Sequence, residues 1–114
     1  MLLVEDDADL AGVVVEALAQ DGHTAVHVRG PDEARALATS DSWDAFVVDA
    51  FGSYSQPDAE YRSTLRHLAR RAPVVVTSGR AWAMTDLGAD AVLPKPYDLA
   101  DLTDTLSSLP RRTC

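Results

Sequence analysis

The chain has 114 residues, of which 46% are hydrophobic and 25% charged, and its formal net charge is −8. This length and composition predict one soluble globular domain with a single core. The negative charge argues against direct nucleic-acid binding, because phosphate backbones are held by clustered lysine and arginine side chains. No apolar stretch approaches the roughly 20 residues of a membrane-spanning helix, and the start is unlike a signal peptide, so we expect a cytoplasmic protein without a membrane partner.

Short apolar runs alternate along the chain with segments of helical periodicity. Continuous apolar or β-branched runs predict strands over residues 2–4, 24–28, 45–48, 74–77 and 91–93. Apolar residues at helical spacing predict helices over residues 10–18, 31–40 and 61–72, a short and weak helix over 81–87, and a last helix over 99–109. Gly22 and Pro73 end the first and third helices, and Asp98 is a favoured N-cap for the last.

This alternation of strands and helices predicts an α/β fold. The strands are continuous apolar runs, which is typical of a parallel sheet buried on both faces. Right-handed crossovers place the helices on both sides of such a sheet. We therefore expect residues 1–114 to form a single domain, a three-layer sandwich around a five-stranded parallel sheet. The functional crevice of such a sheet lies beyond the carboxyl ends of its strands.

Polar residues stand at the carboxyl ends of four predicted strands. They are Glu5, Asp6 and Asp7 after the first strand, Asp49 after the third, Thr77 and Ser78 at the end of the fourth, and Lys95 after the fifth. Parallel neighbouring strands would bring these groups into one pocket. Taken alone, the acids after the first strand equally suit the start of a helix. Together with Asp49 and Lys95 they favour a functional site.

The expected pocket has the composition of a phosphate-transfer site. Crowded carboxylates raise each other's pKa unless a cation compensates their charge. Mg²⁺ is a suitable cation, because it binds a few carboxylates and leaves positions for water or phosphate oxygens. A carboxylate beside a metal ion and a lysine can act as a nucleophile toward phosphorus. Asp49 stands alone at its strand end and is the candidate nucleophile, and Ser78 can hydrogen-bond an attached phosphate.

Five short motifs resemble, in order, the landmarks of the response-regulator receiver family of two-component signalling. They are Leu3-Val4-Glu5-Asp6-Asp7, Val47-Val48-Asp49, Thr77-Ser78-Gly79, Gly88-Ala89-Asp90 and Lys95-Pro96. Each motif is weak alone, but together they cover nearly the whole chain and form a specific signal. The resemblance implies a flavodoxin-like sandwich with strand order 2-1-3-4-5.

The resemblance also implies which residues bind metal and phosphate. Asp49 resembles the phosphoacceptor, which is at the same time a metal ligand. Asp6 resembles the acid that binds Mg²⁺ directly, and Glu5 the acid that acts on it through water. The backbone carbonyl of Phe51 would complete the protein ligands.

The remaining roles concern the phosphoryl contact and the switch. Lys95 resembles the lysine that contacts the phosphoryl group, and by the same resemblance the Lys95-Pro96 bond is expected to be cis. Ser78 resembles the switch hydroxyl, which in the family directly precedes a small residue, here Gly79. Thr77 is the less favoured choice for this role.

Three features depart from the family pattern. The loop over residues 50–57 lacks the usual Met-Pro step and Asp-Gly turn. The span from Ser78 to Lys95 is short, so the fourth helix is expected to have lost a turn or more, about four residues per turn. Val92 stands where the family has an aromatic switch residue. These departures predict a receiver with an atypical output.

The resemblance implies a phosphoacceptor signalling domain, not an enzyme, with weak self-dephosphorylation. Its partners would be a histidine kinase or phosphotransfer protein and a downstream protein target, and a homodimer is possible through the last two helices. The alternative is a degenerate receiver-like module that binds proteins without phosphorylation. An aspartate-nucleophile phosphatase ranks low, because Phe51 stands where a second acid is needed. Flavin binding is disfavoured by the acidic loop after the first strand.

Overall fold

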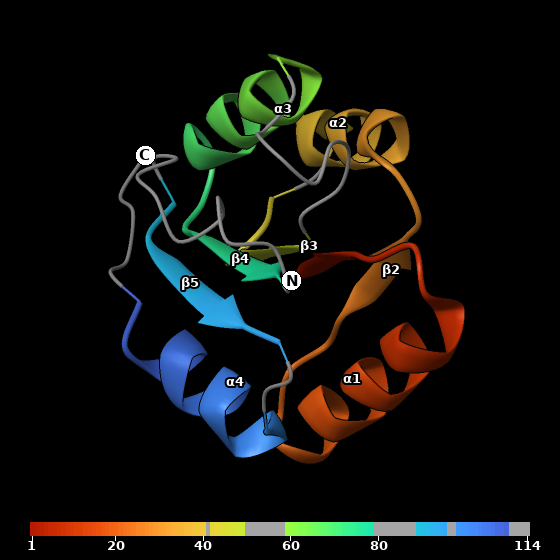
Figure 1. The fold of residues 1–114 in the computed structure, drawn as a ribbon, viewed down its shortest axis with the longest axis vertical. Helices are drawn as coiled ribbons and strands as arrows, with labels where there is room; N and C mark the ends of the chain where they lie inside the picture. Colours follow the sequence, from red (N-terminus) through yellow and green to blue (C-terminus); the bar gives the residue numbers. More distant parts are fainter. Residues whose placement is uncertain (41, 50–58, 79–88, 96–97, 110–114) are drawn as a thin grey trace.

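The computed structural model describes residues 1–40, 42–49, 59–78, 89–95 and 98–109, and the structural statements below concern these residues. The strands are β1 (Leu2–Val4), β2 (Val26–Val28), β3 (Phe46–Asp49), β4 (Val74–Ser78) and β5 (Ala91–Pro94). The described helices are α1 (Ala8–Gln20), α2 (Pro31–Ser40), α3 (Ala59–Ala69) and α4 (Leu99–Ser107). Figure 1 shows the sheet between two helical layers, with α2 and α3 at the top and α1 and α4 at the bottom.

The five strands form one parallel sheet in the order β2-β1-β3-β4-β5. The predicted three-layer α/β fold and strand order are therefore confirmed. The strand order reverses between β1 and β3, which is the switch point where such sheets form their functional crevice. Val4 lies level with Val48 in the register of these two strands, so their carboxyl ends stop side by side.

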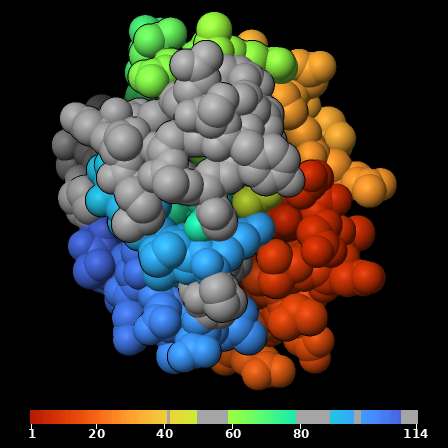
Figure 2. Space-filling view, viewed as in Figure 1, coloured from red at the N-terminus to blue at the C-terminus, as the bar shows by residue number. Residues whose placement is uncertain are grey.

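Each face of the sheet covers its own core, because successive side chains of a strand point to opposite faces. Phe46 and Val48 pack with Leu65 on the side of α2 and α3. Val47 packs with Leu18 on the side of α1 and α4. All of these side chains are buried. Figure 2 shows the atoms of α2 and α3 in the upper half of the molecule and those of α1 and α4 in the lower half. Burial on both faces explains why the strands read as continuous apolar runs.

The helix ends agree only in part with the predicted caps. Asp7 is the N-cap of α1, and its Oδ1 atom accepts hydrogen bonds of 3.1 Å from the amides of Asp9 and Leu10. Gly22, just beyond α1, has a φ of +88°, a left-handed conformation that costs glycine little. Asp98 occupies the predicted N-cap position of α4, although its side chain makes no cap hydrogen bond.

Strand β2 is shorter than predicted and begins at Val26 instead of residue 24. A strand extends only as far as its neighbour offers hydrogen bonds, and the register partner of Val26 is Leu2, the first residue of β1. The carbonyl of Thr24 instead accepts a 2.7 Å hydrogen bond from the α-ammonium group of Met1. The short pairing follows from the short β1.

Several predicted features lie outside the described residues. These are the loop over residues 50–57, the short helix over 81–87 and the cis bond before Pro96. The third predicted helix, α3, ends at Ala69 rather than 72, and beyond it the amide of Arg71 donates to the carbonyl of Leu68 three residues back, as in a tighter final turn. None of the described helices has the length and apolar character needed to cross a bilayer.

Candidate functional site

Three carboxylates meet at the carboxyl edge of the sheet. Glu5 and Asp6 follow β1, and Asp49 ends the neighbouring β3. One carboxylate oxygen from each of these residues lies within 4.8 Å of the other two. Glu5 is buried and Asp6 is exposed, while 14% of the Asp49 side chain is exposed. The cluster is therefore anchored in the sheet at one end and open to solvent at the other.

Lys95 reaches the same cluster from the end of β5. Its Nζ atom lies 2.8 Å from Oδ1 of Asp49 and 3.4 Å from Oε2 of Glu5. The amide of Lys95 donates a 2.7 Å hydrogen bond to the carbonyl of Ser78, which continues the pairing of β4 with β5 beyond Pro94. The sheet thus fixes the position of the lysine main chain, and its side chain spans the distance to the acids.

The charges in the cluster are only partly balanced. Burial raises the pKa of Glu5, and the negative charge of Asp49 raises it further. The amide of Asp7 donates a 3.3 Å hydrogen bond to Oε1 of Glu5. This bond and the charge of Lys95 lower the pKa of Glu5, but they do not cancel the rise. Burial alone lowers the pKa of Lys95, but the hydrogen bond to Asp49 and the charges of both acids raise it on balance. Among the described residues, the Lys95 ammonium group contacts two of the three carboxylates, those of Glu5 and Asp49.

This donor set fits Mg²⁺. Hard divalent cations prefer oxygen ligands, and Mg²⁺ in proteins binds a few carboxylates together with water or phosphate oxygens. A hollow of about 230 Å³ opens at the cluster, and it is lined by Val4, Glu5, Asp6, Arg29, Pro31 and Asp49. Burial is the main cause of the raised pKa of Glu5, and a cation in this hollow would offset the second cause, the negative charge of Asp49. Glu5, Asp6 and Asp49 each offer one carboxylate oxygen to such a cation.

Comparison with known proteins places the chain in a family. No protein-family model matches it. The response regulator protein PmrA of Pseudomonas aeruginosa is 31% identical over 118 residues, covering 99% of this chain and 53% of that protein. A CheY-like response regulator receiver domain from Methylobacillus flagellatus has a TM-score of 0.79 at 25% identity, with 96% of both chains covered. The chain is a response-regulator receiver domain.

Other relatives agree with this assignment. The transcriptional regulatory protein TcrA of Mycobacterium tuberculosis is 31% identical over 121 residues, which are 98% of the receiver domain and 46% of TcrA. The TrrA response regulator of Thermotoga maritima, solved with Mg²⁺-BeF, has the same fold with a TM-score of 0.78 at 18% identity, and 96% of each chain is covered. The receiver domain spans about half the length of the curated relatives it matches.

The candidate switch hydroxyls, and the valine at the position of the family's aromatic residue, lie in the neighbouring strands β4 and β5. Ser78 and Thr77 are both buried at the end of β4, where Thr77 is the register partner of Asp49 and Ser78 that of Pro94. Val92 lies in β5 and packs, half-buried, against the core on the side of α2 and α3. The backbone carbonyl of residue 51 lies outside the described residues.

Two residues of the site were missed from the sequence, one within β2 and one directly after it. Arg29 lines the hollow at the acids and directly follows the last residue of β2. The ring of His27 lies 2.6 Å from the backbone carbonyl of Glu5. The rule that polar residues after a strand gather at one edge, applied to the second strand as to the others, would have found Arg29. His27 lies inside a strand, where sequence alone indicates only a surface or edge residue.

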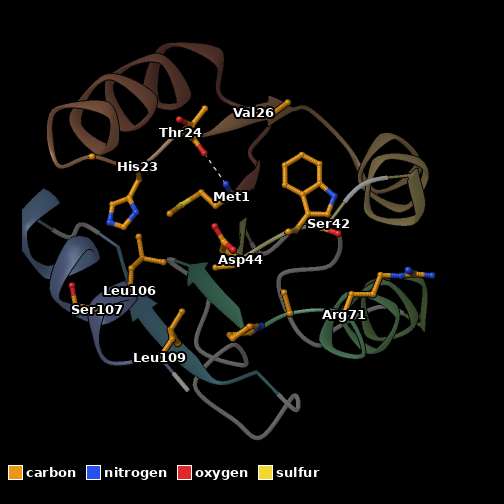
Figure 3. A pocket seen from close by; sticks show the side chains of 15 residues that line it. Met1, His23, Thr24, Val26, Ser42, Asp44, Arg71, Leu106, Ser107 and Leu109 are labelled. Carbon is orange, nitrogen blue, oxygen red and sulfur yellow. Dashed lines mark hydrogen bonds between the residues drawn. The ribbon is translucent and has the colours of Figure 1, made fainter. Parts of the chain in front are cut away.

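A larger hollow, of about 820 Å³, lies at the opposite edge of the sheet (Figure 3). Its walls are residues that precede the strands, such as Met1, Thr24 and Asp44, together with the end of α4 around Leu106 and Leu109. The acid cluster lies at the carboxyl ends of the same strands, so choosing the hollow with the larger volume would place the candidate site at the wrong edge of the sheet. The chemistry of the smaller hollow identifies it as the candidate site.

Proposed function

We propose that the receiver domain accepts a phosphoryl group on Asp49 from a histidine kinase or phosphotransfer protein, with Mg²⁺ bound beside it. The position of Asp49 carries this proposal. Its carboxylate lies 2.8 Å from the Lys95 ammonium group and shares a 4.8 Å cluster with Glu5 and Asp6. A carboxylate can approach a negatively charged phosphoryl group only where positive charges offset the repulsion between them.

In the proposed reaction, an oxygen of the Asp49 carboxylate attacks the phosphorus atom of a phosphohistidine. A P–O bond forms while the P–N bond breaks, and the electron pair passes to the imidazole nitrogen of the donor, which takes up a proton. Lys95 attracts the oxygens of the transferred group and stabilises their charge. Mg²⁺, when bound, supplies a second positive charge next to these oxygens. Slow attack of water on the acyl phosphate would restore the carboxylate, a weak self-dephosphorylation.

Two proteins of the same fold support this proposal. A response regulator from Burkholderia pseudomallei, with a TM-score of 0.78 at 24% identity, contains a phosphorylated aspartic acid. The TrrA protein contains Mg²⁺-BeF. By extension, we propose that residues 1–114 act as one receiver domain in the cytoplasm, between a phosphodonor protein and a downstream protein target, with a homodimer as a possible form.

The switch of the domain is proposed to begin at Ser78 and to reach the surface without an aromatic rotation. Ser78 is 3% exposed at the end of β4, one residue beyond the register partner of Asp49. Val92 has no ring that could turn between buried and exposed positions, and it already packs against the core. Phosphorylation would therefore change the surface by a different route, which is our proposal of an atypical output.

The test is the intact mass of the protein after incubation with a small phosphodonor and MgCl₂. Wild type should gain one phosphoryl group, and Asp49→Asn should gain none. Asp44→Asn is the matched control, because Asp44 is an exposed acid at the opposite edge of the sheet. The proposal fails if wild type gains no mass or if the gain persists in Asp49→Asn.

A second candidate function is a degenerate receiver that binds a protein partner without phosphorylation. The packing of Val92 favours it, because the aromatic side chain that usually reports the phosphate is replaced by a half-buried valine that packs against the core. Addition of beryllofluoride and Mg²⁺ distinguishes the two functions in NMR spectra. A phosphorylation switch should show shift changes beyond the acid cluster, whereas the degenerate module should show none.

A further inference from the structure

We propose that His27 is a positioning residue that holds the main chain of Glu5, and thereby the acid pair, in the geometry that binds Mg²⁺. This inference rests on the proposed function, because it concerns the same metal site. It assigns a role to a side chain of β2 that does not itself belong to the acid cluster. The observation is a 2.6 Å contact between Nε2 of His27 and the backbone carbonyl oxygen of Glu5.

The contact fixes the proton arrangement of the His27 ring. A carbonyl oxygen can only accept a hydrogen bond, so the nitrogen that faces it must carry a proton. His27 therefore donates from Nε2, either as the neutral Nε2–H tautomer or as the imidazolium ion. A distance of 2.6 Å is slightly shorter than the usual range for N–H···O hydrogen bonds, which is about 2.7–3.2 Å.

The hydrogen bond takes the place of a missing rung in the sheet. The amide of Glu5 donates to the carbonyl of Val28 at 3.0 Å, which extends the β1–β2 pairing by one step. The next rung of a parallel ladder would join the amide of Gly30 to the carbonyl of Glu5. Strand β2 ends at Val28, and the described hydrogen bonds include no such rung. A buried carbonyl without a partner is costly, and the His27 ring supplies one.

The position of this carbonyl matters because it belongs to the peptide unit that leads into Asp6. A peptide unit is planar, so fixing its oxygen also fixes the direction in which the chain enters Asp6. The side chain of Glu5 is held separately, with Oε1 accepting from the amide of Asp7 and Oε2 facing Lys95. Together these contacts hold both the main chain and the carboxylate of Glu5.

The test compares Mg²⁺ affinity in two substitutions of one residue. His27→Leu removes the donor, while His27→Gln keeps an N–H group at about the position of Nε2. Titration with MgCl₂, followed by the NMR shifts of the amides of Glu5 and Asp6, gives the dissociation constant. We expect His27→Leu to bind Mg²⁺ about tenfold more weakly, the low end of the effect of residues that orient metal ligands. His27→Gln should recover most of the affinity.

The control is His23→Leu, which removes a histidine from the opposite edge of the sheet and should leave Mg²⁺ affinity unchanged. Equal affinity of His27→Leu and wild type, or an equal loss in the Leu and Gln variants, would overturn the inference. Absence of Mg²⁺ binding in wild type would instead overturn the proposed function. If His27→Leu does not fold, NMR of the ring nitrogens of wild-type His27 tests the hydrogen bond instead. A neutral Nδ1–H tautomer cannot donate from Nε2 to the Glu5 carbonyl, so finding it would overturn the inference.

Discussion

Replacement of Lys95 by methionine tests the charge balance of the site most severely. The substitution keeps much of the apolar stem but removes the ammonium group that lies 2.8 Å from Asp49 and 3.4 Å from Glu5. Loss of one partner from a fully buried ion pair costs about 3–5 kcal/mol. The Lys95 side chain is 27% exposed, so solvent screens part of this interaction. We therefore expect Lys95→Met to lose about 1–2 kcal/mol of unfolding free energy without Mg²⁺.

Mg²⁺ should reduce this deficit, because it replaces the missing positive charge. At ten times its dissociation constant, a ligand that binds only the folded state stabilises it by about 1.4 kcal/mol. Lys95→Met should gain more than wild type at a given Mg²⁺ concentration, since the ammonium group no longer repels the cation or occupies Asp49. The assay is urea denaturation with and without MgCl₂. Arg66→Met, which removes an exposed cation from α3, is the control and should change stability by less than about 0.5 kcal/mol.

The deficit of Lys95→Met should also depend on pH. Lys95 lowers the pKa of Glu5, so its removal should raise that pKa further above the ordinary value. A carboxyl group whose pKa is raised by folding contributes stability at low pH and loses it as the pH rises through the raised pKa. The deficit should therefore grow from acidic to neutral pH. A variant as stable as wild type at neutral pH without Mg²⁺, or a deficit that Mg²⁺ leaves unchanged, would refute this reasoning.

Four further substitutions test other parts of the structure. Asp7→Ala should cost about 1 kcal/mol in urea denaturation through loss of the α1 cap, whereas Asp98→Ala, which removes no cap bond, should cost much less. Leu18→Ala should cost about 2–5 kcal/mol in the same assay, because Leu18 is fully buried. NMR titration should give His67 a lowered pKa, because burial and then the positive charge of Arg71 disfavour its protonated form. Arg71→Gln should therefore raise the pKa of His67. A pKa of His67 that Arg71→Gln does not move would contradict the electrostatic cause.

Much of the fold could be predicted because the apolar pattern is set by local rules. Strands buried on both faces read as continuous runs, so the runs ending at Val4 and at Val48 were found from the sequence. Strand β2 was predicted too long because residues 24 and 25 have no register partner on β1. The strand propensity of single residues cannot show this. Asp98 was expected to cap its helix by residue type alone, yet its side chain makes no such bond.

The candidate site could be predicted in outline for a similar reason. Parallel neighbours end at one edge, so Glu5, Asp49 and Lys95 were expected to meet, and their distances agree with that expectation. The contact of His27 with the carbonyl of Glu5 could not be predicted, because it depends on where β2 ends and on the direction of one ring. Features fixed by chain topology were accessible from the sequence, and features fixed by side-chain direction were not.

The most direct test of the phosphoacceptor assignment is chemical mapping of the modified residue. An acyl phosphate, unlike a carboxylate, is reduced by borohydride to the alcohol, so a phosphorylated aspartate becomes homoserine. After treatment with a small phosphodonor and MgCl₂, followed by borohydride, peptide mass spectrometry should find homoserine at position 49 and at no other aspartate. Homoserine at another position, or none in a protein that has taken up phosphate, would contradict the assignment of Asp49.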